Sequence, residues 1–547
     1  MIKKHFSELS QQVIDDLDLN EFISFFFLPF VSGSLRRFPE LDTFYENHAR
    51  LASEVVKYHS KKEFATLKHG EELTRRQDFV KKLMCNKSLE KSLENVVVKG
   101  YQLALALGVR ENNLTAINEA ETAQRILTEY TTANDEYWPF QWRRDCIDFS
   151  QSKVRESIAI ELDVLQKFIA VVEAGMAIEE NETSDIAAKF RETALHINET
   201  EKYAWCKAII TDLEEFGTAE LTIRYNFFNK INNVVGVSYK SRNKSITKMV
   251  GWYYHRKDKK AHWLDTPQKE ERILLKSLEL LVGEQMSNIM SLLRRQHEFE
   301  FFLNSLRYID TIRSYNLPIV FPIMYEKADD ISFHELYNPC LLMQCSSRKL
   351  VSNMAQINDN KKVIIITGPN NSGKSVYIKS IGIAHILAQN GLPICAKKAK
   401  MKECDRIATH CIAKGDIAQG EGMFVQELNR IDRLIDYVTP NSLILIDEPI
   451  RGSSFEDAEA MTLRLIKGFA ELGAVTYITT HLHDAAQKAE EINEVKNLRT
   501  EIVEKKFTYK VISGREKSYG LQVADEYGLT EEAILRRMKE KKESVHA

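Results

Sequence analysis

The sequence predicts a mostly α-helical N-terminal part followed by an α/β domain with a buried parallel sheet. The prolines indicate this division, because proline interrupts helices. No proline lies between Pro39 and Pro139 or between Pro139 and Pro267, whereas seven prolines divide the chain from Pro318 onward. In that last third, short runs of β-branched and aliphatic residues end at glycine, carboxylate or histidine side chains. Such runs are typical of the central strands of a parallel sheet.

Length and composition fit a globular protein of several domains. The 547 residues are enough for about two to four domains. The net charge of −3 excludes a strongly basic protein, so contact with nucleic acid would need a local basic patch. The eight cysteines form no Cys-x-x-Cys pair. This pattern argues against zinc and against a disulfide scaffold, and it favours a cytoplasmic protein with reduced thiols.

An apolar run at 22–31 resembles a signal peptide or a membrane anchor only superficially. Acidic residues precede it, where a signal peptide carries positive charge. It is also shorter than the ~20 apolar residues of a membrane span. We expect a buried helical segment here and no membrane association.

Three segments are expected along the chain: an N-terminal helical segment at 1–70, a helical domain at 71–316, and an α/β domain with a C-terminal helix at 317–547. The last boundary follows from the change in character at 317–322. Between Leu274 and Leu292, apolar side chains recur every three or four residues, which is the spacing of one helix face. We interpret this face as packing between long helices.

A basic stretch with interleaved aromatic residues interrupts the helical pattern at 238–262. It contains eight lysines and arginines against one acid, Asp258. Valines at 234–237 and aromatic residues at 252–254 predict short strands or a hairpin. The stretch is interpreted either as a DNA contact or as a solvated charged hairpin. In the first case the candidate DNA-binding residues are Lys240, Arg242, Lys244, Arg256, Lys257, Lys259 and Lys260.

The strongest motif is Gly368-Pro369-Asn370-Asn371-Ser372-Gly373-Lys374-Ser375, which fits the phosphate-binding pattern G-x-x-x-x-G-K-[ST]. The run 361–367 predicts a buried strand before it, and 376–388 predicts a helix after it. Glycines let backbone N–H groups converge on phosphate oxygens at the start of a helix. Lys374 would contact the β and γ phosphates, and the Ser375 hydroxyl would ligate Mg²⁺. The expected cofactors are ATP and Mg²⁺.

A second apolar run, 442–446, ends in the carboxylates of Asp447 and Glu448. Parallel α/β sheets bind ligands at the carboxyl ends of their strands. Asp447 would hold the Mg²⁺ shell through water. Glu448 would act as the general base or orient the attacking water. The alternative, a solvated acidic turn, leaves the apolar run unexplained.

A third run, 475–480, ends at His481. If the three strands lie side by side, they bring Lys374, the two carboxylates and His481 to one triphosphate, where His481 could reach the γ-phosphate or the attacking water. His483 is a competing candidate, and a structural role is the alternative for a lone histidine.

Several motifs across 350–543 resemble the MutS family. They are Ile366–Asn370, Asp405–Ile407, Gly420 with Phe424 and Glu427, Ser442–Glu448 followed by Arg451-Gly452, Thr480-His481, and Lys517–Leu521. P-loop proteins in general lack the last of these, Lys-Ser-Tyr-Gly-Leu, so the set is specific. Upstream, Arg76-Gln77 before Leu83 is weakly similar to the start of the family's lever domain.

The resemblance implies a homodimer with composite ATP sites, each completed by the other subunit, and a C-terminal helical dimerisation element. It implies ATP hydrolysis coupled to opening and closing of helical lever and clamp arms around duplex DNA. The phosphate-loop, carboxylate and histidine residues keep the roles given above, and Asn370 lies beside the phosphates. Phe424 and Glu427 belong to a loop that approaches the partner's nucleotide.

Four departures from the family pattern stand out. Gly422-Met423 replaces Ser-Thr, so a hydroxyl contact with the partner's nucleotide is missing. Ile450–Ser453 replaces Gly-Arg-Gly-Thr, and Leu350 stands about where an aromatic residue often stacks on adenine. Finally, Phe44-Tyr45-Glu46 matches the mismatch-reading tripeptide, but only about thirty residues separate it from Arg76, too few for the reading domain and its connector. We expect a short form that lacks this domain, and we interpret the tripeptide as coincidence.

Two functions remain open at this point. The first is an ATP-gated clamp on duplex or branched DNA, used in mismatch repair or recombination control. The second is an ATPase that remodels a protein or ribonucleoprotein partner. A transporter-type ATPase subunit is excluded, because its Leu-Ser-Gly-Gly signature is absent.

Overall fold

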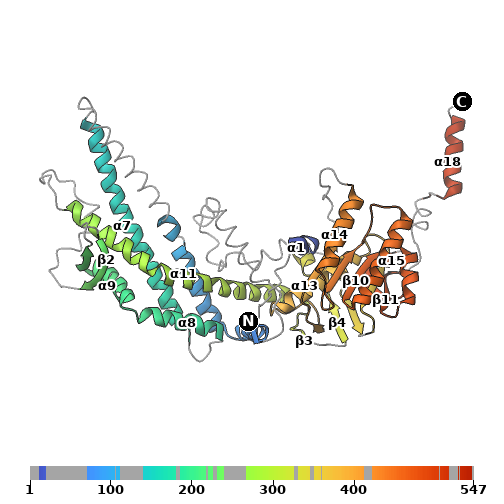
Figure 1. The fold of residues 1–547 in the computed structure, drawn as a ribbon, viewed down its shortest axis with the longest axis horizontal. Coiled ribbons are helices and arrows are strands. Elements are labelled where there is room, and N and C mark those ends of the chain that lie inside the picture. Colours follow the sequence, from blue (N-terminus) through green and yellow to red (C-terminus); the bar gives the residue numbers. More distant parts are fainter. Residues whose placement is uncertain are drawn as a thin grey trace. The chain divides into compact units, whose positions relative to one another are not determined.

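The computed structural model describes residues 11–19, 71–104, 106–110, 140–179, 185–216, 220–225, 231–238, 267–325, 330–344, 350–358, 360–411, 422–503, 506–515, 528 and 530–544. These residues fall into two compact units, coloured along the sequence in Figure 1. A helical unit comprises the described residues of 82–303. A sheet-containing unit comprises those of 11–19 and 71–81 and those from 304 onward.

The helical unit is built from long helices. They are α7 (Phe140–Met176), α8 (Asp185–Asn198), α9 (Glu201–Phe216), the part of α11 (Pro267–Ser314) before 304, and the end of α5 (Glu71–Cys85). Residues 87–104 and 106–110 are helical as well. The predicted apolar helix face is confirmed, because Leu278, Leu281, Ile289 and Leu292 on the 48-residue helix α11 are fully buried.

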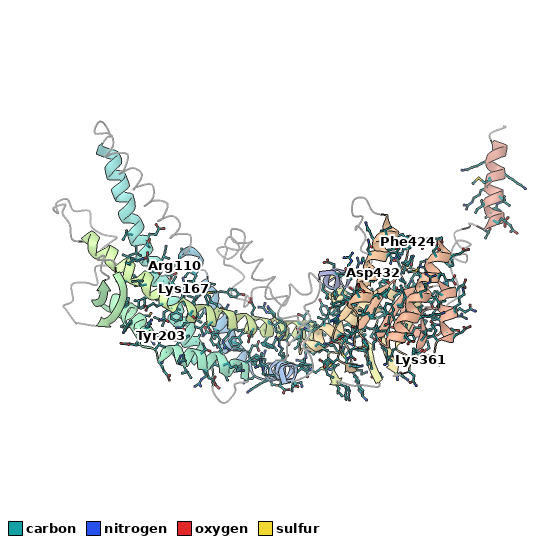
Figure 2. All side chains as sticks on the ribbon, viewed as in Figure 1. Arg110, Lys167, Tyr203, Lys361, Phe424 and Asp432 are labelled. Atoms are coloured by element: carbon teal, nitrogen blue, oxygen red, sulfur yellow. The ribbon has the colours of Figure 1, made fainter. Side chains whose placement is uncertain are left out.

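Aromatic pairs and one buried ion pair hold these helices together. Phe168 of α7 meets Tyr203 of α9 edge to face, with ring centroids 5.8 Å apart. Arg110 donates from Nε to both carboxylate oxygens of Glu161 on α7, at 2.7 and 2.9 Å. Burial raises the pKa of Glu161 even though the guanidinium opposes this effect. Figure 2 labels Arg110 and Tyr203. The charge-paired contact is suited to fixing the register of the helices that it joins.

A two-stranded antiparallel sheet lies between α9 and α11 in the chain, formed by β1 (Glu220–Tyr225) and β2 (Ile231–Ser238). The strand predicted at 234–237 is therefore confirmed as part of β2, but its partner is the upstream strand β1. The remainder of the basic stretch, 239–262, lies outside the described residues, as do the apolar run at 22–31 and Phe44–Glu46.

The sheet-containing unit has a six-stranded sheet in the order β12-β11-β6-β10-β9-β8. Neighbouring strands are parallel except for the antiparallel pair β11 and β12. The strands are β6 (Val363–Thr367), β8 (Ile407–Cys411), β9 (Leu443–Asp447), β10 (Val475–Thr480), β11 (Val495–Val503) and β12 (Lys506–Ser513). Every residue of β6, β8 and β9 is buried, as expected for strands of a sheet covered on both faces.

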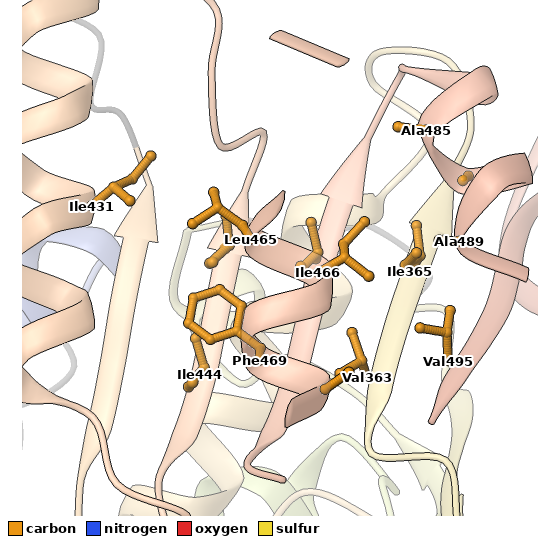
Figure 3. Packing of buried hydrophobic residues seen from close by; sticks show 14 of the residues in the cluster. Val363, Ile365, Ile431, Ile444, Leu465, Ile466, Phe469, Ala485, Ala489 and Val495 are labelled. Atoms are coloured by element: carbon orange, nitrogen blue, oxygen red, sulfur yellow. The ribbon is translucent and has the colours of Figure 1, made fainter. Parts of the chain in front are cut away.

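Helices cover the two faces of this sheet. They are α13 (Lys374–Gln389), α14 (Met423–Tyr437), α15 (Phe455–Leu472) and α16 (His483–Lys488), with a 3₁₀ turn at Ala489–Glu491. Figure 3 shows Leu465, Ile466 and Phe469 of α15 packed on the sheet beside Ile444 and Val363. Each such side chain contributes about 1.5–3 kcal/mol when fully buried. Because neighbouring strand residues face opposite sides, Leu445 contacts α13 on the other face.

A smaller four-stranded sheet accompanies the large one, in the order β3-β7-β4-β5. Its strands are β3 (Ile323–Tyr325), β4 (Asp330–Leu336), β5 (Asn353–Asn358) and β7 (Lys398–Lys402). The unit also contains the short helix α12 (Cys340–Gln344). The predicted C-terminal helix is α18 (Glu531–Ser544).

The start of the chain packs into the sheet-containing unit, which the sequence did not suggest. Helix α1 (Gln11–Asp16) lies against β8, the last strand of the large sheet. The Gln12 amide donates from Nε2 to the carbonyl oxygen of Thr409 at 2.7 Å. Leu17 is fully buried and reaches α13 beside Gly382. The Gln12 side chain thus occupies a backbone acceptor on the edge strand of the sheet.

No helix among the described residues is long and apolar enough to cross a bilayer. The division of the chain into segments at 1–70, 71–316 and 317–547 stays a proposal.

Candidate nucleotide-binding site

The glycine-rich loop lies between β6 and the first residue of α13, Lys374. Its backbone needs glycine at two positions. Gly368 has φ +152°, and a Cβ there would lie 2.0 Å from Oγ1 of Thr500 on β11. Gly373 has φ +98° and caps the helix without a side-chain hydrogen bond. The loop therefore wraps tightly at the N-terminus of α13, where N–H groups without helical partners can bind phosphate oxygens.

The Lys374 side chain folds back over this loop. Its Nζ donates to the carbonyl oxygens of Gly368 at 2.7 Å and Pro369 at 2.9 Å, and the residue is 5% exposed. A buried ammonium group that donates to neutral carbonyls is suited to exchanging them for phosphate oxygens. Ser372 stiffens the loop, since its hydroxyl donates to the Pro369 carbonyl at 2.7 Å.

The strand order places the predicted site residues at one edge of the sheet. β6, β10 and β9 are adjacent, with Thr480 in register with Thr367 and Thr479 in register with Asp447. The carboxyl ends of the three strands therefore meet, as the site hypothesis required. Lys374 is close enough to Glu448 to lower the pKa of that carboxyl.

Asp447 and Ser375 have the chemistry of a Mg²⁺ site. The Thr479 hydroxyl donates to Oδ1 of Asp447 at 2.5 Å, which fixes the carboxylate at the end of β9. Asp447 is 9% exposed, and Ser375 is half-buried in the first turn of α13. One carboxylate and one hydroxyl, completed by nucleotide phosphates and water, are what Mg²⁺ takes in nucleotide sites. Among the described residues, no cluster of three or more His, Cys, Asp or Glu side chains forms a protein-only metal site.

Glu448 occupies a constrained position just after β9. Its φ of +57° lies in the left-handed region, which a non-glycine residue adopts at some cost. Its side chain is 13% exposed, with Oε2 2.8 Å from Nε of Arg451 and Oε1 3.7 Å from Nδ1 of His481. His481, followed by Arg451 and Lys374, lowers the pKa of Glu448 below its ordinary value of 4.5, although burial opposes them. The group is therefore a carboxylate at neutral pH, as a base or water-orienting group must be.

The histidine beside Glu448 is His481. Its side chain follows β10 directly and is 47% exposed, so the ring is accessible from solvent. His483 is the first residue of α16 and is half-buried. Geometry thus favours His481 over its competitor for contact with a nucleotide.

The turn after Glu448 is held from two sides. Glu427 on α14 is 2% exposed, and its carboxylate accepts from the backbone N–H of Arg451 at 3.1 Å and of Gly452 at 3.0 Å. His410 on β8 donates from Nε2 to the Pro449 carbonyl at 2.9 Å, and burial lowers the pKa of this histidine to about 4. Glu427 therefore uses both carboxylate oxygens to hold this turn. Its expected approach to a partner's nucleotide stays a prediction.

An aromatic residue that the sequence did not single out lies beside the phosphate loop. Tyr509 on β12 is 49% exposed, and its ring Cδ1 would lie 3.3 Å from a Cβ at Gly373. The Asn353 amide donates to the Tyr509 carbonyl at 3.0 Å, which ties β12 to β5. An exposed ring here is suited to stack on a nucleotide base. The signal that could have found it is the alternation of aromatic residues at 507 and 509 in a strand pattern. Leu350, half-buried before β5, is not aromatic.

Several residues predicted from the sequence lie outside the part of the chain that the structure describes. The candidate DNA-binding residues Lys240, Arg242, Lys244, Arg256, Lys257, Lys259 and Lys260 lie outside the described residues. So do Gly420 and the motif at 517–521. Gly422 caps α14 without a side-chain hydrogen bond, and Phe424, labelled in Figure 2, packs at the edge of the hydrophobic core.

A phosphate loop joining a parallel strand to a helix, with a carboxylate pair at the end of a strand in the same sheet, defines a P-loop nucleotide hydrolase. Residues 364–545 match the family model described as MutS domain V. This part of the chain is therefore a domain of the MutS family, the family's ATP-binding ATPase domain.

Relatives support this assignment. The chain is 32% identical over 224 residues to "DNA mismatch repair protein MutS" of Caldicellulosiruptor saccharolyticus, which covers 39% of this chain and 26% of the relative. It is 27% identical over 417 residues to the protein of the same name from Fervidobacterium nodosum, covering 72% of this chain and 48% of the relative. The chain thus spans about a quarter to a half of the length of the curated relatives that it matches.

Proposed function

We propose that the chain hydrolyses Mg-ATP in a homodimer and uses the cycle to open and close its helical part around duplex or branched DNA. The observation that carries the hydrolytic step is the meeting of β6, β10 and β9 at one sheet edge, with Lys374 near enough to Glu448 to affect its pKa. In this proposal Lys374 binds the β and γ phosphates, and Glu448 activates water. His481 orients that water or contacts the γ-phosphate.

Magnesium would be held by the Ser375 hydroxyl and, through water, by Asp447. Once bound, it would neutralise charge on the phosphates. The residues Gly368–Ser375 would enclose the phosphates through their N–H groups, and the exposed Tyr509 ring would support the base.

Hydrolysis is tested by two substitutions in the full chain. Lys374→Ala should weaken nucleotide binding at least about a hundredfold, because it removes a charge-assisted contact from a desolvated site. Glu448→Gln should keep nucleotide binding and slow hydrolysis by roughly 10²–10⁴-fold. Normal hydrolysis by Glu448→Gln would show that the base is assigned wrongly.

The dimer is tested by sedimentation of the wild type and of Glu448→Gln with and without ATP. Composite sites predict a dimer in the nucleotide-bound state, and α18 exposes Leu535 and Met538, which suit a dimerisation contact. A monomer under both conditions excludes composite sites.

DNA binding is supported by the basic stretch at 240–260 and by the printed names of the relatives. We would measure affinity for homoduplex, mismatched, junction and single-stranded DNA with and without ATP, as a function of salt. Phosphate contacts make affinity fall steeply with salt. The affinity should drop in a variant that carries glutamine in place of Arg256, Lys257, Lys259 and Lys260.

The charge-matched control replaces four exposed lysines of the sheet-containing unit by glutamine: Lys398, Lys400, Lys467 and Lys506. It should bind DNA as the wild type does. Binding that ignores both salt and the basic stretch would instead favour the second candidate, an ATPase that remodels a protein or ribonucleoprotein partner. The same DNA panel separates a role in mismatch repair from one in recombination control, since the first requires preference for mismatches and the second for junctions.

A further inference from the structure

A single buried carboxylate from the start of the chain joins two elements of the sheet-containing unit. Asp16 ends α1 and is 5% exposed. Its Oδ2 accepts from the backbone N–H of Cys411, the last residue of β8, at 3.2 Å. Both of its oxygens pair with Nη2 of Arg430 on α14, at 2.8 and 2.7 Å. Asp16 therefore sets where α14 lies relative to the end of β8.

Helix α14 connects the Asp16–Arg430 ion pair to the candidate site. Arg430 and Glu427 are three residues apart, so their side chains leave neighbouring positions on one helix face. Glu427 accepts from the N–H groups of Arg451 and Gly452, as described above. The helix packs closely against this turn, because a Cβ on Gly452 would lie 2.7 Å from the backbone nitrogen of Phe424. Movement of α14 would therefore move the turn.

The turn at Arg451 and Gly452 also holds Glu448, the residue that is proposed to activate water. Arg451 places its Nε 2.8 Å from Oε2 of Glu448. Glu448 itself has the strained φ of +57°, which surrounding contacts must maintain. Three successive contacts thus lead from the N-terminal segment to Glu448, and each is fixed by charge or by backbone hydrogen bonds.

We propose that Asp16 is a positioning residue for ATP hydrolysis, which acts through Arg430, α14 and Glu427 to hold Glu448 in its reactive place. This inference rests on the proposed role of Glu448. It makes one residue of the N-terminal segment, Asp16, part of the machinery that positions Glu448. A role confined to holding α1 in place is the competing explanation, and the two differ in their kinetic effects.

The test measures ATP hydrolysis and nucleotide affinity in the full chain. Asp16→Asn keeps an oxygen that can accept from Cys411 but removes the charge that pairs with Arg430. We expect kcat to fall about tenfold, because small displacements of a catalytic group are costly, while KM for ATP changes less than about twofold. The losses in Asp16→Asn and Arg430→Gln should be less than additive in the double variant, since both substitutions disrupt the Asp16–Arg430 ion pair.

The matched control is Gln12→Ala, which removes another contact of the same helix, the hydrogen bond to Thr409, without touching α14. Its kcat should equal that of the wild type. Should Asp16→Asn fail to fold, Arg430→Lys keeps the charge but loses the planar guanidinium group, and the same fall in kcat is expected.

Three outcomes would overturn the proposal. The first is a wild-type kcat in Asp16→Asn or, where that variant does not fold, in Arg430→Lys. The others are a higher KM with unchanged kcat in the same variant, and a loss of kcat in Gln12→Ala equal to that in Asp16→Asn. Failure of the proposed function is distinguishable, because it shows as absent hydrolysis in the wild type or full hydrolysis in Glu448→Gln, before any change at Asp16.

Discussion

Replacing Gly368 by alanine should distort the phosphate loop, and the structure indicates which side chain is responsible. The new Cβ would lie 2.0 Å from Oγ1 and 3.2 Å from Cβ of Thr500. Thr500 cannot easily turn away, because it is fully buried in β11 and a β-branched side chain has few alternative rotamers. The Thr500 hydroxyl makes no hydrogen bond with a described residue. The clash would therefore disturb packing without breaking a hydrogen bond.

Two effects set the magnitude. Overpacking a core position costs about 1–3 kcal/mol. A side chain at positive φ adds roughly 1–2 kcal/mol. Gly368→Ala should therefore lower the free energy of unfolding by about 2–5 kcal/mol and weaken ATP binding at least about tenfold. Adding Thr500→Ala removes the clashing hydroxyl. It should restore about 1–3 kcal/mol of unfolding free energy, the loss that overpacking causes, but not the loss that comes from the positive φ of residue 368.

The assay is a double-mutant cycle over Gly368→Ala and Thr500→Ala, read by denaturant unfolding and by binding of a fluorescent nucleotide. The cycle should show a favourable coupling between the two substitutions. If Thr500→Ala rescues neither stability nor binding, the loop is not limited by this contact and the steric argument is refuted.

Three further results are expected. Arg451→Gln removes a cation that lowers the pKa of Glu448, so the acid limb of the kcat profile should move to higher pH. In the wild type, the charged Glu448 side chain stabilises the fold above its ordinary pKa of 4.5. This stabilisation is lost as the pH falls through the lower pKa of the folded state. An unchanged kcat profile in Arg451→Gln would contradict the expected shift. Tyr509→Ala should raise KM for ATP about tenfold with little effect on kcat, whereas Tyr509→Phe keeps the ring and should behave as the wild type. Removal of Mg²⁺ by a chelator should stop hydrolysis, and residual turnover without the metal would exclude the roles given to Ser375 and Asp447.

Much of the hydrolytic site could be predicted because its residues lie at the ends of strands rich in β-branched and aliphatic residues. The runs before Gly368, Asp447 and His481 are long enough to be buried on both faces, and right-handed parallel topology brings their carboxyl ends to one edge. Local spacing then fixes Lys374 relative to the loop. The prediction of three neighbouring strand ends is confirmed by the strand order.

The contributions from distant segments could not be predicted in this way. Tyr509 reaches the phosphate loop because β12 pairs with β11, which in turn pairs with β6. The residue pattern of one strand does not specify which strand it pairs with. In the sequence, Glu427 is one of several acids on an amphipathic helix. Its role in holding the turn after β9 depends on where that turn lies in the fold. Asp16 is one of several acids near the N-terminus. Its burial depends on tertiary packing, since local periodicity does not report long-range pairing.

The docking of α1 has a consequence for how the protein is synthesised. Gln12 and Thr409, which share a hydrogen bond, are 397 residues apart in the chain. At typical ribosomal rates of about 5–20 residues per second, the N-terminal helix leaves the ribosome roughly 20–80 s before the strand that receives it. During that interval its apolar side chains have no native partner. Docking of α1 must therefore await synthesis of β8, which lies almost four hundred residues further along the chain.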